Sequence, residues 1–274
     1  SPPHMPLDDA PEKYLDMFSP EEVPLRPNVY VDGKLAHDEN WFKIYLWDFL
    51  YYQEHLPYTE TLPDGFDLRH LTARYYGLTT WVDDTVGRLM TGLRQNRLDE
   101  NTIVVFLSDH GDNLGSHHLF NKSMLIEESI RIPMIWFGPG ITTAADDQQV
   151  AQLIDVMPTI LDLCGGCTPD SVQGRSLAPI LRGLAEPSVE NHAFIETDKG
   201  AIGLRTDGHL YGLQLDEAGN PADAGSSFFD LTRDPFEQNN LAVVDEQKAL
   251  AAELKSKLCA WNATTPRLDV SPDH

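Results

Sequence analysis

Apolar residues recur at steps of three and four along one long segment, and this spacing predicts an α-helix with a single apolar face. The residues on that face are Leu71, Tyr75, Leu78, Val82, Val86, Leu89 and Leu93. A continuous β-branched and apolar run follows at residues 102–107 (TIVVFL), which is typical of a strand buried on both faces of a parallel sheet. A second run at 132–137 predicts another strand, and residues 155–164 predict a short helix.

The pattern changes after residue 186, where short strand-like runs alternate with turn residues. These runs lie at 193–197, 201–205 and 209–215, with a candidate fourth strand at 228–230. An amphipathic helix is predicted at 246–261, so this part reads as a small antiparallel sheet with a terminal helix. We therefore expect an α/β domain over residues 1–186 and a subdomain over 187–274. Before residue 70 the chain predicts long loops with short helical pieces, such as 40–52.

Composition narrows the functional classes. The chain has 20 basic and 43 acidic residues and a formal net charge of −23, which argues against nucleic acid as a partner. It has no apolar run of the ~18 residues that a membrane span needs, and its three cysteines exclude a disulfide scaffold. We therefore expect a soluble protein, cytoplasmic or periplasmic if bacterial, and leave the compartment and homo-oligomerisation open.

The residues with the clearest chemistry follow the predicted strand at 102–107. Asp109 and His110 lie at its carboxyl end, which is where open α/β sheets bind ligands. An adjacent carboxylate and imidazole can both reach one divalent cation, and His117, His118 and Lys122 add polar groups downstream. Two interpretations follow: a metal site with an anionic ligand, or a polar surface loop.

The segment at 108–133 (SDHGDNLGSHHLFNKSMLIEESIRIP) resembles the second signature region of the sulfatases, in the alkaline-phosphatase superfamily. Other blocks resemble the family in the same order. They lie at residues 1–6, 75–94, 153–177 and 229–241. The resemblance implies an alkaline-phosphatase-like sandwich of a mostly parallel sheet between helices, present here in part.

The resemblance also implies roles for individual residues. Asp109 and His110 would bind a divalent metal, usually Ca²⁺ in sulfatases. Many sulfatases have Asn at the position of His110, and an imidazole favours Mn²⁺ or Zn²⁺, as in phosphohydrolases of the superfamily. Lys122 would contact the ester oxygens, His4 would bind the same group and protonate the leaving oxygen, and His117 is a further candidate for substrate contact.

The family's nucleophile is a formylglycine made from Cys or Ser in C/S-x-P-x-R, and this chain lacks that motif. Cys164, Cys167 and Cys259 all fail the spacing, and the family's N-terminal pair of metal-binding Asp residues is missing too. We therefore expect this chain to be the C-terminal portion of a sulfatase domain, inactive alone, whose partner is an N-terminal segment of the same protein.

The predicted function of the intact protein is hydrolysis of a sulfate ester on a carbohydrate or small organic group. A phosphonate or phosphodiester hydrolase of the same superfamily is the first alternative, and a non-catalytic remnant or binding module is the second. Because the chain is strongly acidic, small or singly sulfated substrates fit better than a heavily sulfated polymer.

Overall fold

A computed structural model describes residues 3, 10–31, 33–35, 67–142, 149–184 and 191–265. The predicted helical piece at 40–52 and the candidate residue His4 lie outside these ranges. The contacts divide the chain into two compact units. The first unit holds residues 1–106, 112–122 and 137–139, and the second holds 107–111, 123–136 and 140–274. The predicted domain boundary at residue 186 stays a prediction.

The first unit is organised around the long helix α3 (Leu68–Gln95), which confirms the helix predicted from apolar spacing. Asp67 caps this helix, because its side chain accepts from the backbone N–H groups of Arg69 and His70. Shorter elements precede and follow it. They are α1 (Glu12–Leu15), η1 (Pro20–Glu22), η2 (Pro27–Val29), β1 (Tyr30–Val31), β2 (Lys34–Leu35), η4 (Asp99–Asn101) and η5 (Ser116–His118).

Only the N-terminal half of α3 is buried by the described part of its own unit. Leu71 and Leu78 pack with Tyr14 and Val29 in a core cluster that also contains Phe120. Farther along the same apolar stripe, Leu89 has 65% of its surface exposed. The stripe therefore continues beyond the core that the described residues provide.

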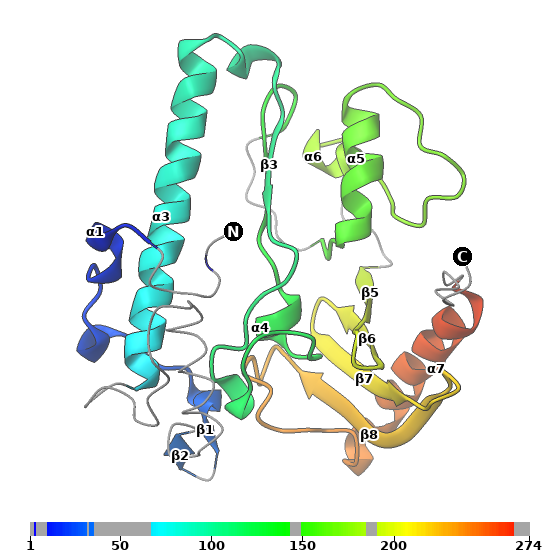
Figure 1. Ribbon diagram of the computed structural model, residues 1–274. Coiled ribbons are helices and arrows are strands. Elements are labelled where there is room, and N and C mark those ends of the chain that lie inside the picture. Colours follow the sequence, from blue (N-terminus) through cyan, green and yellow to red (C-terminus); the bar gives the residue numbers. More distant parts are fainter. Residues whose placement is uncertain are drawn as a thin grey trace, which may run out of the picture. The chain divides into compact units, whose positions relative to one another are not determined.

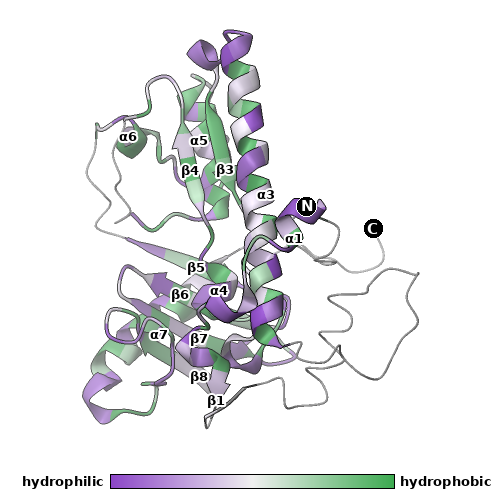
Figure 2. Ribbon diagram, turned by 90° about the vertical axis from the view of Figure 1, so that its left-hand side faces the viewer, coloured by the Kyte–Doolittle hydropathy of each residue, from purple (hydrophilic) through white to green (hydrophobic). Residues whose placement is uncertain are grey.

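Two strands match the apolar runs of the sequence. They are β3 (Val104–Leu107) and β4 (Met134–Phe137), which the structure assigns to one two-stranded sheet, and Figure 2 shows them as largely hydrophobic. The four residues of β3 are half-buried rather than buried on both faces. The difference has a physical cause, because a strand loses solvent on both faces only when neighbouring elements cover it.

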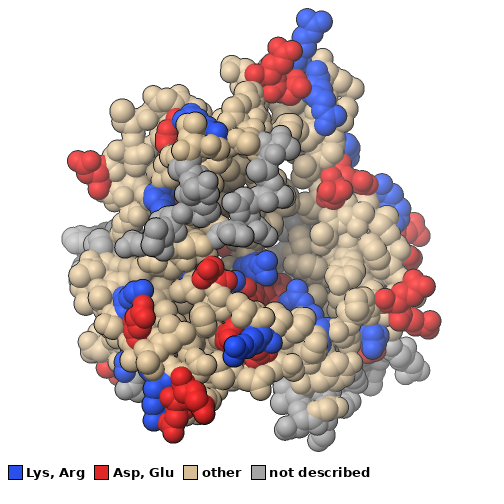
Figure 3. All heavy atoms as spheres, turned by 180° about the vertical axis from the view of Figure 1, so that it is seen from behind, with Lys and Arg blue, Asp and Glu red and all other residues tan. Residues whose placement is uncertain are grey.

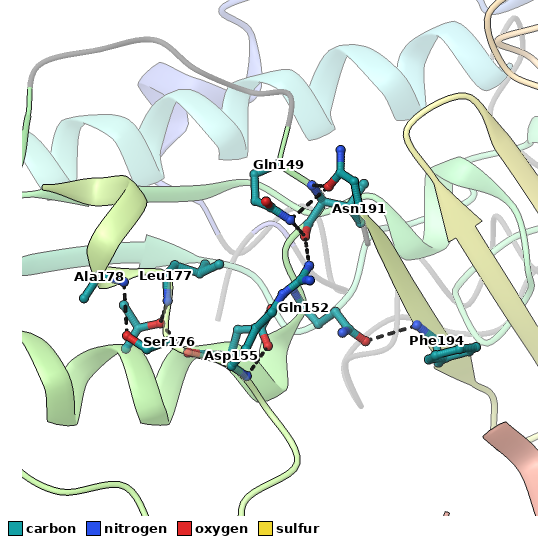
Figure 4. A network of polar contacts seen from close by, with 11 residues as sticks. Gln149, Gln152, Asp155, Ser176, Leu177, Ala178, Asn191 and Phe194 are labelled. Carbon is teal, nitrogen blue, oxygen red and sulfur yellow. Dashed lines mark hydrogen bonds and ion pairs between the residues drawn. The ribbon is translucent and has the colours of Figure 1, made fainter. Parts of the chain in front are cut away.

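The second unit contains α4 (Glu127–Ile130), η6 (Leu153–Asp155), α5 (Val156–Leu163) and α6 (Ala178–Leu181). Polar contacts join the α5 region to the segment before α6, as Figure 4 shows. The carboxylate of the buried Asp155 accepts a hydrogen bond from the backbone N–H of Arg175. The hydroxyl oxygen of Thr159 accepts one from the backbone N–H of Leu177. Hydrogen bonds from backbone N–H groups thus join the two ends of the block at 153–177 that resembles the sulfatases.

The C-terminal part forms the antiparallel sheet that the sequence predicts, in the order β5–β6–β7–β8. Its strands are β5 (His192–Glu196), β6 (Ala201–Thr206), β7 (His209–Leu215) and β8 (Pro221–Asp230). After η7 (Asp245–Gln247), helix α7 (Lys248–Thr264) packs against β6 and β7, as Figure 1 shows. Leu254 and Leu258 of α7 share a buried cluster with Ile202 and Phe228 of the sheet.

Figure 3 shows acidic and basic side chains interspersed over the face in view, without a broad basic area there. Among the helices of the described ranges, none combines the length and the apolar composition needed to cross a bilayer.

Candidate metal and anion site

Two local hydrogen bonds stabilise the loop after β3, and the second of them orients the His110 ring. The Ser108 hydroxyl group donates to the carbonyl oxygen of His110 at 2.7 Å, which fixes the turn. The ring atom Nδ1 of His110 lies 2.8 Å from the carbonyl oxygen of Gly111 and donates to it. In a neutral imidazole the other ring nitrogen, Nε2, would then carry the lone pair, and it lies 3.7 Å from Oδ2 of Asp109.

The Asp109 carboxylate is open to solvent, with 83% of its side chain exposed. Desolvation raises its pKa, but the backbone N–H and the ring of His110 outweigh this effect, together with further hydrogen bonds, and lower the pKa below its usual value. Oδ1 accepts the His110 N–H at 3.0 Å. Asp109 is therefore held in its charged form at the end of the strand.

This pair fits a divalent cation by the chemistry of its donors. Metal-binding histidines usually donate one ring N–H to a carbonyl or carboxylate, which leaves the other nitrogen for the metal. His110 has this arrangement, and Asp109 adds an ionised oxygen beside Nε2. The two residues would supply part of a coordination shell, and further ligands would have to come from other residues.

Helix α4 packs against the loop that follows β3. The backbone N–H of Gly111 donates to the carbonyl oxygen of Ser129 at 2.8 Å. A Cβ atom at position 111 would lie 1.9 Å from the carbonyl oxygen of Glu128, so only glycine fits this approach. The position of the loop is thus set by the backbone of α4.

Helix α4 is itself held by the C-terminal part of the chain. Its first N–H, at Glu127, donates to Oε2 of Glu237 at 2.8 Å. The Glu127 carboxylate forms two hydrogen bonds with the guanidinium group of Arg205 on β6, at 2.9 and 3.1 Å. Glu237 is 2% exposed, and burial raises its pKa to about 8, helped by the nearby Glu127 and Glu128 and opposed by the N–H of Glu127.

Two further predicted residues, Lys122 and His117, lie in the first unit, in the loop at 112–122. Lys122 is half-buried, and the ring atom Nε2 of His117 accepts from the side-chain amide of Asn28 at 3.2 Å. Asn28 is 2% exposed, so the ring of His117 is hydrogen-bonded to a buried side chain. The predicted roles of Lys122 and His117 toward substrate stay predictions.

The same loop has an unusual backbone. Leu114, His117, His118 and Asn121 have φ values of 44°, 53°, 57° and 66°, in the left-handed region that L-residues rarely adopt. Hydrogen bonds close the loop, from the N–H of Asn113 to the carbonyl oxygen of Asn121 at 2.7 Å among others. Such strain persists only where surrounding contacts enforce it, and it is common at functional sites.

The candidate residues predicted from the sequence did not include Arg205 or Glu237. One signal for Glu237 was available, because it is the Glu of the block FDLTRDPFEQNNL at 229–241. Neither its burial nor its contact with a residue 110 positions earlier can be read from that block.

An apolar groove of about 740 Å³ lies in the first unit along the C-terminal half of α3. Val86, Leu89 and Leu93 of α3 line it, together with Val104 and Phe106 of β3. The residues that line it are mostly apolar.

Comparisons with known proteins agree with the sequence motifs. An arylsulfatase of Clostridium perfringens is 30% identical over 254 residues, which cover 90% of this chain and 48% of the relative. The structure of the Bacteroides fragilis protein yidJ matches with a TM-score of 0.75 at 28% identity, over 97% of this chain and 53% of that protein. The phosphonate monoester hydrolase SpPMH of Silicibacter pomeroyi matches with a TM-score of 0.75 at 26% identity, over 95% and 54%.

The chain spans about half the length of these relatives. Their structures confirm the predicted α/β class of the alkaline-phosphatase-like proteins. The sequence model of the Sulfatase family matches residues 3–166, which is more than half of the chain. The chain therefore belongs to the sulfatase family.

Proposed function

We propose that the intact protein hydrolyses a sulfate ester of a carbohydrate or other small organic group, with Asp109 and His110 as metal ligands. The observation that carries this proposal is the orientation of His110. Its Nδ1 donates to the carbonyl oxygen of Gly111, so Nε2 can bind a cation beside the charged Asp109. The similarity to an arylsulfatase supports the choice of sulfate esters.

The chain's own residues would divide the remaining work. Lys122 would bind the ester oxygens, His4 would bind them too and protonate the leaving oxygen, and His117 would contact the substrate. We propose Ca²⁺ as the metal, which when bound supplies positive charge that offsets charge on the sulfuryl oxygens. In so acidic a chain, these groups would reverse the sign of the local field where the anion binds.

The nucleophile in this proposal is a formylglycine in an N-terminal segment of the same protein. We propose that this segment packs against the apolar groove on α3 and β3, where Leu89 is 65% exposed. An apolar surface of this kind is stabilised when a partner covers it. The chain alone would then lack turnover, whereas the assembled protein would be active.

A phosphonate or phosphodiester hydrolase is the second candidate function, and His110 is the observation that favours it. An imidazole ligand suits Mn²⁺ or Zn²⁺ better than Ca²⁺. The similarity to SpPMH, a phosphonate monoester hydrolase, also supports this second candidate function. This enzyme would use the same residues and differ in the metal that it binds.

A substrate panel with the intact protein separates these candidates. We expect kcat/KM for an aryl sulfate to exceed that for an aryl phosphonate monoester and an aryl phosphodiester, each measured with Ca²⁺, Mn²⁺ and Zn²⁺. Equal or greater turnover of a phosphorus ester would contradict the sulfatase proposal. No turnover of any substrate, in a protein without C/S-x-P-x-R upstream, would instead identify a non-catalytic remnant.

A further inference from the structure

We propose that Glu237 and Arg205 are positioning residues for the Asp109–His110 pair and that they act through helix α4. The inference rests on the proposed function, because it assigns the two residues a role toward that metal pair. All the contacts involved lie within the second unit.

The first link is the hydrogen bond from the Glu127 N–H to Oε2 of Glu237, at 2.8 Å. Glu237 is buried, and its φ of 54° lies in the left-handed region, where the backbone of a residue with a Cβ atom is strained. Its other carboxyl oxygen, Oε1, has no hydrogen-bond partner among the described residues. A buried carboxyl group on strained backbone is costly, so a surface turn alone does not account for it.

The second link joins α4 to the sheet. Arg205 is on β6, a strand paired on both sides, with Ala193 of β5 and Leu210 of β7 opposite this residue. Its guanidinium group holds the Glu127 side chain by two hydrogen bonds, and the side chains are only 19% and 11% exposed. Two hydrogen bonds between one guanidinium group and one carboxylate fix the orientation of the two groups as well as the distance between them. Glu127 is therefore held at its backbone by Glu237 and at its side chain by Arg205.

The third link passes from α4 to the metal pair. The carbonyl oxygen of Ser129 accepts the Gly111 N–H at 2.8 Å, and the Glu128 carbonyl oxygen lies against the Gly111 Cα. The carbonyl oxygen of Gly111 in turn holds Nδ1 of His110. Any shift of α4 would move Gly111 and hence rotate the imidazole that is proposed to bind the metal.

The magnitude of such an effect is known in general. Removing a group that orients a metal-binding histidine typically weakens metal binding by about 10–100-fold. A group that only stabilises the sheet would lower the melting temperature without that change. The two roles therefore differ in metal affinity and in the local stability of the Gly111 hydrogen bond.

The test uses the intact protein with Glu237→Ala, Glu237→Gln and a matched control, Asp216→Ala. Gln retains an oxygen that can accept the Glu127 N–H, whereas Ala does not. Asp216 is also in the second unit, and its Oδ1 accepts from two backbone N–H groups, at 2.9 and 2.8 Å, in the turn after β7. Ca²⁺ affinity is measured by calorimetric titration, and exchange of the Gly111 amide hydrogen by NMR or mass spectrometry.

We expect Glu237→Ala to weaken Ca²⁺ binding by about tenfold and to accelerate exchange of the Gly111 amide, while Glu237→Gln restores both. Asp216→Ala should lower the melting temperature and change neither. Unchanged affinity and exchange in Glu237→Ala, or equal changes in Asp216→Ala, would overturn the proposal.

An Asp109→Asn variant separates this inference from the proposed function. If Asp109→Asn leaves Ca²⁺ affinity unchanged, the metal pair itself is wrong, and the positioning role proposed for Glu237 and Arg205 falls with it. If Asp109→Asn abolishes binding while Glu237→Ala does not weaken it, the metal pair stands and the positioning role is wrong.

Discussion

At the scale of single residues, the ionisation of Glu237 makes stability depend on pH. Its pKa is about 8 in the folded protein, against 4.5 for an ordinary Glu, because its carboxyl group is buried and faces the nearby Glu127, Glu128 and Asp234. Between these two values the folded state holds a proton that the unfolded state has lost. The free energy of unfolding therefore falls as the pH rises through this window.

We predict that Glu237→Gln removes this dependence, because Gln does not titrate. In urea unfolding between about pH 5 and pH 9, the wild-type protein should lose on the order of a few kcal/mol more stability than the variant. The control is Glu253→Gln, which changes an exposed carboxylate that pairs with Lys257 on α7. Parallel pH curves for the wild-type protein and Glu237→Gln would show that Glu237 is ionised throughout.

At the scale of elements, the contact between the loop after β3 and α4 depends on the absence of a side chain at Gly111. We predict that Gly111→Ala lowers the free energy of unfolding by about 1–3 kcal/mol, because the new Cβ would lie 1.9 Å from a backbone oxygen of Glu128. The matched control is Gly87→Ala in α3, where a Cβ meets nothing within 4 Å.

In a helix, replacing Gly by Ala at an open position should raise stability by about 0.5–1 kcal/mol. The two variants thus make the same chemical change with opposite expected signs in urea unfolding. A stabilising or neutral Gly111→Ala would show that α4 is free to move away from the loop.

At the scale of the whole molecule, the apolar stripe of α3 extends past the core that the described residues form. We predict that Leu89→Glu weakens association with a separately produced N-terminal segment by at least about tenfold, because it places a charge in an apolar interface. Val243→Glu is the control, since Val243 is 86% exposed and lies outside the groove. Association is measured by calorimetry or co-purification, and equal binding by Leu89→Glu and the wild-type protein would place the segment elsewhere.

Much of the architecture could be predicted from local patterns. The spacing of Leu71, Leu78 and their neighbours predicted α3, and the apolar runs predicted β3 and β4 to within a few residues. These predictions succeed because burial on one face imposes a period that belongs to each element by itself. The motif around Asp109 and His110 could also be read from the sequence, because its residues are neighbours in the chain.

The support behind the site could not be predicted in this way. Glu127 meets Arg205 across 78 positions and Glu237 across 110. No spacing in the sequence specifies such meetings, because they depend on how the sheet and α4 pack in three dimensions. Local periodicity thus accounts for the elements and a contiguous motif for the candidate ligands. The pKa of Glu237, the fit of Gly111 and the open groove on α3 follow from long-range packing alone.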